Sequence, residues 1–189
     1  MLGYDAPRWH ALLNDLPAAL LVVAVLFDFG AAAWKRESLR WAGIWTLWAG
    51  VIGGWAAVVS GMLAEETIEH GEAIHALMER HEQMAIMTMS VFTVILGWKM
   101  VRRFALPASE AALTRFLGVV GLAGLIWVAV LGGKLMFEHA AGIPNERLQA
   151  ELLDRGAMAP GGEGGGGQAG DTAQTAGHQH APGTPPHEH

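Results

Sequence analysis

Histidine is the residue type in this sequence with the widest chemical use, and the chain has nine histidines. A neutral imidazole is the commonest metal ligand in proteins, and imidazole is also an axial ligand of haem iron. His10, His81 and His139 each lie at the end of an apolar stretch that we expect to be a helix. Because helical bundles build sites from side chains on facing helices, we predict that two or three of these histidines bind one haem or one transition-metal ion. Asp15 is a further candidate metal ligand.

Four more histidines form two pairs in the C-terminal segment, His178 with His180 and His187 with His189. Residues 156–189 contain ten Gly and four Pro but no Leu, Ile, Val, Phe, Trp or Tyr. Such a segment has nothing to bury, so we predict a disordered Gly/His-rich tail. Paired histidines on a flexible acidic tail would capture Zn²⁺, Ni²⁺ or Cu²⁺ weakly. The alternative is a passive solvated tail.

Two ionisable side chains, Asp28 and Lys134, interrupt the apolar stretches. An acid or base within a membrane segment is a functional hypothesis by default, and its partner should be named. Lys134 lies near a helix end, where its ammonium would reach the membrane boundary or meet Glu66 or Glu138. A third hypothesis is a proton or metal transporter that uses these two charges, although one acid does not make a relay through the bilayer. Candidate partners of Asp28 are Arg115, Lys35 and Thr46.

The elements that must position these residues are four long apolar stretches. Hydrophobic residues make up 52% of the 189 residues and charged residues only 16%, and the mean hydropathy is +0.29. About 20 mainly apolar residues are needed to cross the hydrocarbon of a membrane. We therefore predict an all-α integral membrane four-helix bundle over residues 1–143, followed by a short amphipathic helix over residues 144–155. The expected spans are Leu16–Trp34, Trp41–Ala64, His81–Val101 and Ala112–Phe137.

The charges of the connectors indicate an orientation. The first and third connectors together carry seven basic and two acidic residues, whereas Glu65–Glu82 carries one basic and six acidic residues. By the positive-inside rule the first and third connectors are cytoplasmic. We therefore expect a multi-pass protein of the cell inner membrane with both termini on the outer, periplasmic side. The net charge of −6 argues against a nucleic-acid partner, and the absence of cysteine excludes thiol chemistry.

Small residues indicate which helix faces pack together. Gly50 and Gly54 form a GxxxG pair in the second stretch, and such residues let helix backbones approach closely in a membrane. In the fourth stretch Gly118 and Gly132 share one face, which His139 continues. We therefore expect the His139 side chain to point into the bundle.

These motifs resemble a bacterial family of predicted four-helix membrane proteins that is classed as a domain of unknown function. Members of that family open with His-Pro-x-x-x-His-Phe-Pro, have an Asp late in the first helix and a His that opens the third, and end with a Gly-Gly-x-x-x-x-x-His segment. The resemblance covers residues 8 to 143 and implies the four-helix membrane fold. Ala11 replaces the first proline of the opening motif, and Asp15 replaces its second histidine. The matching residues are His10, Pro17, Asp28, His81, Gly132, Gly133 and His139.

Two classes of function remain in competition. The first is electron transfer or metal handling at the outer histidine cluster. Because no histidine lies in the cytoplasmic connectors, such a protein could not carry electrons across the whole bilayer by itself. The second is a non-catalytic membrane subunit whose polar outer cap docks a partner protein or a second copy of the chain. The lipid bilayer is a partner in both.

Overall fold

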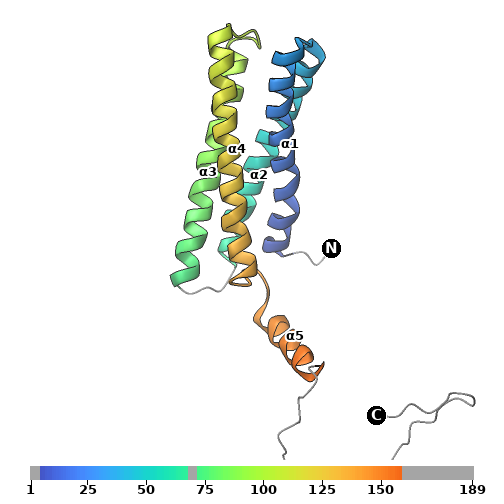
Figure 1. Ribbon diagram of the computed structural model, residues 1–189. Helices are drawn as coiled ribbons and strands as arrows, with labels where there is room; N and C mark the ends of the chain where they lie inside the picture. The colour runs from blue at the N-terminus through green and yellow to red at the C-terminus, as the bar shows by residue number, and fades with distance from the viewer. Residues whose placement is uncertain (1–4, 68–71, 159–189) are drawn as a thin grey trace, which may run out of the picture. The chain divides into compact units, whose positions relative to one another are not determined.

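The computed structural model describes residues 5–67 and 72–158, and this part of the chain is all-helical (Figure 1). The predicted fold class is thereby confirmed. The chain divides into two units, residues 1–144 and 145–189. The first unit holds four long helices and the second holds α5, which is short. The helices are α1 (Ala6–Trp34), α2 (Glu37–Glu65), α3 (Glu72–Val101), α4 (Ala108–Phe137) and α5 (Asn145–Met158).

The first unit consists of two helix hairpins (Figure 1). α1 packs extensively along α2, and α3 packs along α4, while α2 contacts α3 and α1 contacts α4 less extensively. α1 and α3 therefore lie diagonally across the bundle. We call the end that holds the α1–α2 and α3–α4 connections, at the top of Figure 1, the basic end, after Lys35, Arg36, Arg102 and Arg103. We call the opposite end the histidine end, after His10 and His81.

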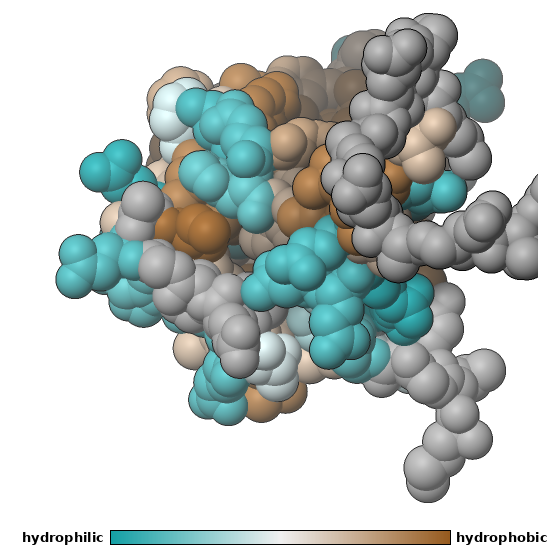
Figure 2. Space-filling model, turned by 90° about the horizontal axis from the view of Figure 1, so that it is seen from below, coloured by the Kyte–Doolittle hydropathy of each residue, from teal (hydrophilic) through white to brown (hydrophobic). Residues whose placement is uncertain are grey.

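All four helices of the first unit are long and apolar enough to cross a membrane. Each exposes large aliphatic side chains to its surroundings. Leu26 of α1, Ile52 of α2, Val94 of α3 and Ile126 of α4 are all more than half exposed. A soluble protein rarely exposes so much contiguous apolar surface, so these side chains are the lipid-facing surface of an integral membrane bundle. Viewed along the bundle from below, hydrophilic and hydrophobic residues lie side by side (Figure 2).

The helices are longer than the apolar stretches that predicted them. α1 begins at Ala6, where the Asp5 carboxylate accepts the Arg8 backbone N–H at 3.3 Å and caps the helix. Pro17 therefore lies inside α1 and not in its first turn. α3 begins at Glu72, so His81 lies within the helix and does not open it. These first turns contain charged and polar side chains, such as Arg8 in α1 and Glu79 in α3, so hydropathy does not detect them.

α5 is also longer than expected. It continues through Gly156 to Met158, whereas the sequence had placed its end at Arg155-Gly156. Arg155 donates from Nε to Glu151 at 2.8 Å in its last turns, and this i,i+4 pair supports the helix there. The predicted disordered tail lies largely outside the described residues.

The two hairpins repeat the same packing contacts after a shift of 71 residues. The Leu21 side chain fills the space over Gly50, where an added methyl group would lie 2.8 Å from it. Phe92 fills the same space over Gly121, at 2.7 Å. Leu21 and Phe92 are both fully buried, so each hairpin places one large side chain on one glycine at the centre of the core. A second pair of contacts repeats with the same shift: Pro17 over Gly53, and Thr88 over Gly124.

The expected close packing by small residues is confirmed. Gly50 and Gly54 are buried, and a methyl group at Gly54 would collide with the Met89 side chain at 2.4 Å. Met89 thus fills a gap in the core, as methionine often does. The tryptophans of α2 differ in their surroundings: Trp45 is 69% exposed, whereas Trp55 donates to the Thr93 hydroxyl at 2.9 Å.

Candidate functional site

His10 lies in the second turn of α1 and reaches across to α2. Its ring packs on Gly61, where an added methyl group would be 3.0 Å from Cε1. Its Nδ1 lies 3.0 Å from the Ala57 carbonyl oxygen and 3.1 Å from the Ser60 hydroxyl. Because Gly61 has no side chain, the His10 ring fits against α2. The hydrogen bond to the carbonyl of Ala57, four residues before Gly61, fixes the orientation of the ring.

His81 repeats this arrangement in the second hairpin. Its ring extends from α3 onto Gly132 of α4, where a methyl group would be 3.1 Å from Cε1. Its Nδ1 lies 3.1 Å from the Val128 carbonyl oxygen. Both imidazole–carbonyl bonds span 47 residues, and the two sets of residues are related by the same shift of 71 as the core contacts. The two histidines are thus equivalent positions of a repeated unit.

The hydrogen bonds fix the tautomer of both rings. A backbone carbonyl only accepts, so Nδ1 of each ring carries the hydrogen and donates it. Nε2 of each ring is then unprotonated and has a lone pair. Within the described part of the chain, no hydrogen bond of either Nε2 is found. This is the arrangement of metal-binding histidines, whose second nitrogen commonly donates to a carbonyl.

The two rings meet across the diagonal of the bundle. Their centres are 6.4 Å apart and their planes are nearly perpendicular, at 89°. Both side chains are half-buried. Beside them lies a cavity of about 50 Å³, which is lined further by apolar side chains such as Val58, Ala85 and Leu125. The cavity has room for an ion or one water molecule, but a haem macrocycle would require the helices to separate.

The third predicted ligand does not join this pair. His139 lies beyond the end of α4, and its side chain is exposed, so the expectation that it points into the bundle is wrong. The helix ends at Phe137, and Ala140 has a left-handed φ of 51°, so the helical face defined by Gly118 and Gly132 does not continue to residue 139. Asp15 is also exposed.

Among residues 5–67 and 72–158, no group of three or more His, Asp or Glu side chains is close enough to hold a metal ion. The structure therefore brings together two of the predicted ligands, His10 and His81. The four tail histidines, His178, His180, His187 and His189, lie outside the described residues.

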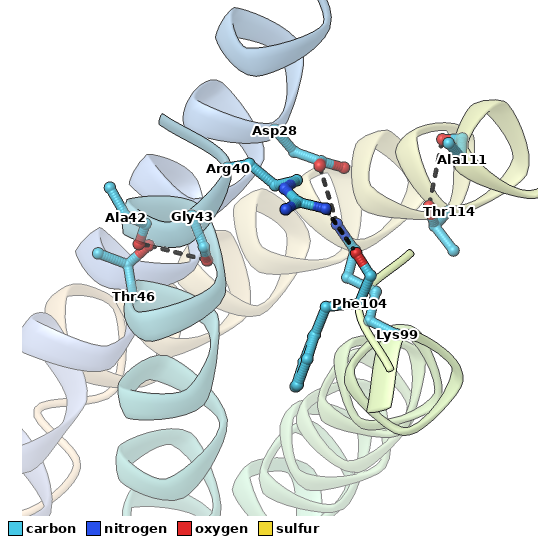
Figure 3. A network of polar contacts seen from close by, with 9 residues as sticks. All are labelled: Asp28, Arg40, Ala42, Gly43, Thr46, Lys99, Phe104, Ala111 and Thr114. Atoms are coloured by element: carbon cyan, nitrogen blue, oxygen red, sulfur yellow. Dashed lines mark hydrogen bonds and ion pairs between the residues drawn. The ribbon is translucent and has the colours of Figure 1, made fainter. Parts of the chain in front are cut away.

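The partner of Asp28 is Lys99. The Lys99 Nζ lies 2.8 Å from the Asp28 Oδ1, and Lys99 is only 9% exposed (Figure 3). None of the three partners expected from the sequence makes this contact. Thr46 donates instead to the carbonyls of its own helix at Ala42 and Gly43, at 2.9 and 3.1 Å. Lys99 was missed because it lies at the end of the third apolar stretch, next to the basic connector, whereas in the structure its side chain is buried in the bundle.

The histidine pair and the Asp28–Lys99 ion pair both join α1 to α3, one near each end. His10 and Asp28 are 18 residues apart on α1, or about 27 Å along its axis, which is close to the thickness of the hydrocarbon. The core cluster between them consists of apolar side chains, including Leu21 and Phe92. Lys134 is exposed on the outside of α4. These positions offer no support for a polar path across the membrane.

The sequence signal that would have identified the histidine pair is the internal repeat. Gly50, Gly53 and Gly61 each recur 71 residues later, as Gly121, Gly124 and Gly132. His10 recurs with the same shift as His81. A comparison of the sequence with itself would have paired these two histidines and left His139 out.

The fold and these sites define a four-helix integral membrane protein with a histidine pair near one end of its core and a buried ion pair near the other. The chain belongs to the predicted membrane protein family DUF2231, whose family model matches residues 8–145. The resemblance found in the sequence is therefore confirmed. No curated protein and no solved structure matches the chain.

Proposed function

We propose that this protein binds one transition-metal ion between His10 and His81 and serves in metal handling or electron transfer. The observation that carries the proposal is a pair of equivalent imidazoles whose ring centres are 6.4 Å apart. In both rings Nδ1 is hydrogen-bonded to a helix carbonyl, so the lone pair of Nε2 is available to a metal ion. Metal–imidazole bonds are about 2.0–2.1 Å long. A metal ion with two opposed imidazoles therefore separates the ring centres by roughly 6.3 Å.

Copper in its reduced state fits this donor set best. Zinc in structural sites takes four protein ligands, and the described residues near the pair supply two imidazoles. Imidazole also suits copper, and Cu⁺ accepts two nearly opposed nitrogen ligands. Haem iron would use the same two nitrogens, but the cavity of about 50 Å³ favours a bare ion.

Copper binding by the purified full chain tests this function. Loaded with Cu⁺ under reducing conditions and freed of excess metal, the protein is expected to retain about one ion per chain. His10→Ala and His81→Ala should each weaken binding by more than the roughly 10–100-fold that loss of an outer partner costs, because each removes a direct ligand. The double variant should be no worse than either single variant. Metal analysis by mass spectrometry measures all of these.

His75→Ala is the matched control, because His75 lies on the exposed first turns of α3, 3.4 Å from Glu65. It should leave copper binding unchanged. A Soret absorption band in the purified protein would show that the two histidines bind haem and not a bare metal ion. Equal metal content in His81→Ala and wild type would refute the metal site and favour the alternative function, a non-catalytic membrane subunit that docks a partner. For that function we expect the histidine substitutions to have small, additive effects.

We also propose an inner-membrane location with the basic end in the cytoplasm, because seven of the twelve lysines and arginines lie at that end of the bundle. The chain has no native cysteine, so any thiol labelling comes from the single cysteine that is introduced. Glu72→Cys at the histidine end should react with a membrane-impermeant thiol reagent in intact cells. Ser38→Cys at the basic end should react only after permeabilisation. The opposite labelling pattern would reverse the orientation.

A further inference from the structure

The basic end of the bundle contains a cavity of about 620 Å³ between the α1–α2 and α3–α4 connections. Five cationic side chains line it, and two acidic ones, Asp28 and Glu37, do so as well. The charge of the lining is therefore +3. The five cationic residues are Lys35, Arg36, Arg40, Lys99 and Arg115.

Both carboxylates in the cavity are already engaged. Asp28 pairs with Lys99 at 2.8 Å. Glu37 accepts from Arg40 at 2.8 Å and from the Trp41 indole at 3.2 Å. For the remaining three cations, Lys35, Arg36 and Arg115, the described part of the chain shows no ion pair or hydrogen bond. Arg115 is half-buried, and a charge withdrawn from water in this way is costly without a counter-ion.

The wall of the cavity is held in place by a specific contact. Arg40 donates from Nη1 to the Phe104 carbonyl at 2.9 Å, which joins α2 to the α3–α4 connection (Figure 3). Arg103 and Phe104 have left-handed φ values of 50° and 61°, a conformation that costs free energy in non-glycine residues. The Phe104 ring also packs on Trp41, with ring centres 5.8 Å apart. The connection is therefore fixed over the cavity.

Exposed tryptophans mark the depth of the cavity in the membrane. Trp34 is 71% exposed and Trp41 is 39% exposed, and both lie at the same end of the bundle as the cationic lining. Tryptophan concentrates at the level of lipid headgroups. Basic pockets between transmembrane helices at that level are suited to phosphate groups, because guanidinium groups match phosphate geometry.

We propose that this cavity is a binding site for a phosphate-bearing anion, with Arg36 and Arg115 as its principal ligands and Lys35 as a third. The phosphate belongs either to the headgroup of an anionic phospholipid or to a small dissolved phosphate compound. This site is independent of the histidine pair, which lies at the other end of the bundle.

The experiment uses the full chain in nanodiscs and the double variant Arg36→Gln/Arg115→Gln. In discs that mix phosphatidylcholine with phosphatidylglycerol, native mass spectrometry is expected to show retained phosphatidylglycerol, reduced roughly tenfold in the double variant. In discs of phosphatidylcholine alone, titration with inorganic phosphate tests the dissolved source. Retention of the lipid alone identifies a lipid site, and saturable phosphate binding that the double variant loses identifies a soluble ligand.

Arg103→Gln is the matched control, because it removes one positive charge from the same end without lining the cavity. It should change neither measurement. If the double variant unfolds, Lys35→Gln/Arg115→Gln provides the same test from a different pair of cations. Absence of both lipid preference and phosphate binding, or an equal loss in Arg103→Gln, would overturn the proposal.

Discussion

Asp28→Ala is expected to destabilise the bundle by about 3 kcal/mol, because it leaves the Lys99 ammonium buried without its counter-ion. Lys99 is 9% exposed and its Nζ lies 2.8 Å from Asp28. Removing one partner of a buried ion pair costs about 3–5 kcal/mol, and we expect the lower end since this pair borders the cavity at the basic end. The free energy of unfolding in mixed detergent micelles, followed by circular dichroism, measures the effect.

Glu37→Ala is the control for this ion pair. It breaks the Arg40–Glu37 contact, which has the same 2.8 Å distance but involves a largely exposed carboxylate. Water screens such an exposed pair, so Glu37→Ala should destabilise the bundle far less than Asp28→Ala does. The double variant Asp28→Leu/Lys99→Leu should recover most of the lost stability, because apolar residues often replace a buried pair without cost. If Asp28→Ala were no worse than Glu37→Ala, the ion pair would have no structural role.

The fold could be predicted from the sequence because membrane insertion depends on a coarse property. Four apolar stretches and polar connectors are sufficient to predict four helices in an antiparallel bundle. The ends of the helices are harder to predict from apolar stretches. The first turns of α1 and α3 are polar, and they are helical because of local capping and chain continuity, as with Asp5 at the start of α1.

The candidate site was predicted only in part, because it depends on the rotation of each helix about its axis. His10 and His81 were predicted to meet, and they do. His139 was excluded by where α4 ends, which no apolar pattern specifies. The pairing of Asp28 with Lys99 depends on which residues of diagonal helices face each other. Charge alone did not distinguish Lys99 from Lys35 or Arg115.

Phe92→Ala is expected to destabilise the bundle by about 3 kcal/mol. Phe92 is fully buried at the centre of the core, and substitution of such a side chain by alanine costs about 3–5 kcal/mol in soluble proteins. In a membrane the lost contribution is mainly van der Waals contact, because lipid is as apolar as the core. The same unfolding measurement applies, and Phe116→Ala, which truncates a 62% exposed phenylalanine of α4, should cost less than about 1 kcal/mol.

The contact between Phe92 and Gly121 allows a test of whether these two residues share one packing space. A methyl group at Gly121 would lie 2.7 Å from the Phe92 ring, so Gly121→Leu overfills the core and should cost about 1–3 kcal/mol. In the double variant Phe92→Ala/Gly121→Leu the new leucine occupies the space left by the ring. The double variant should therefore be more stable than the sum of the two single losses predicts. Strict additivity would mean that the two residues do not share one packing space, and the equivalence of the two hairpins, in which Leu21 lies over Gly50, would then fail at its central contact.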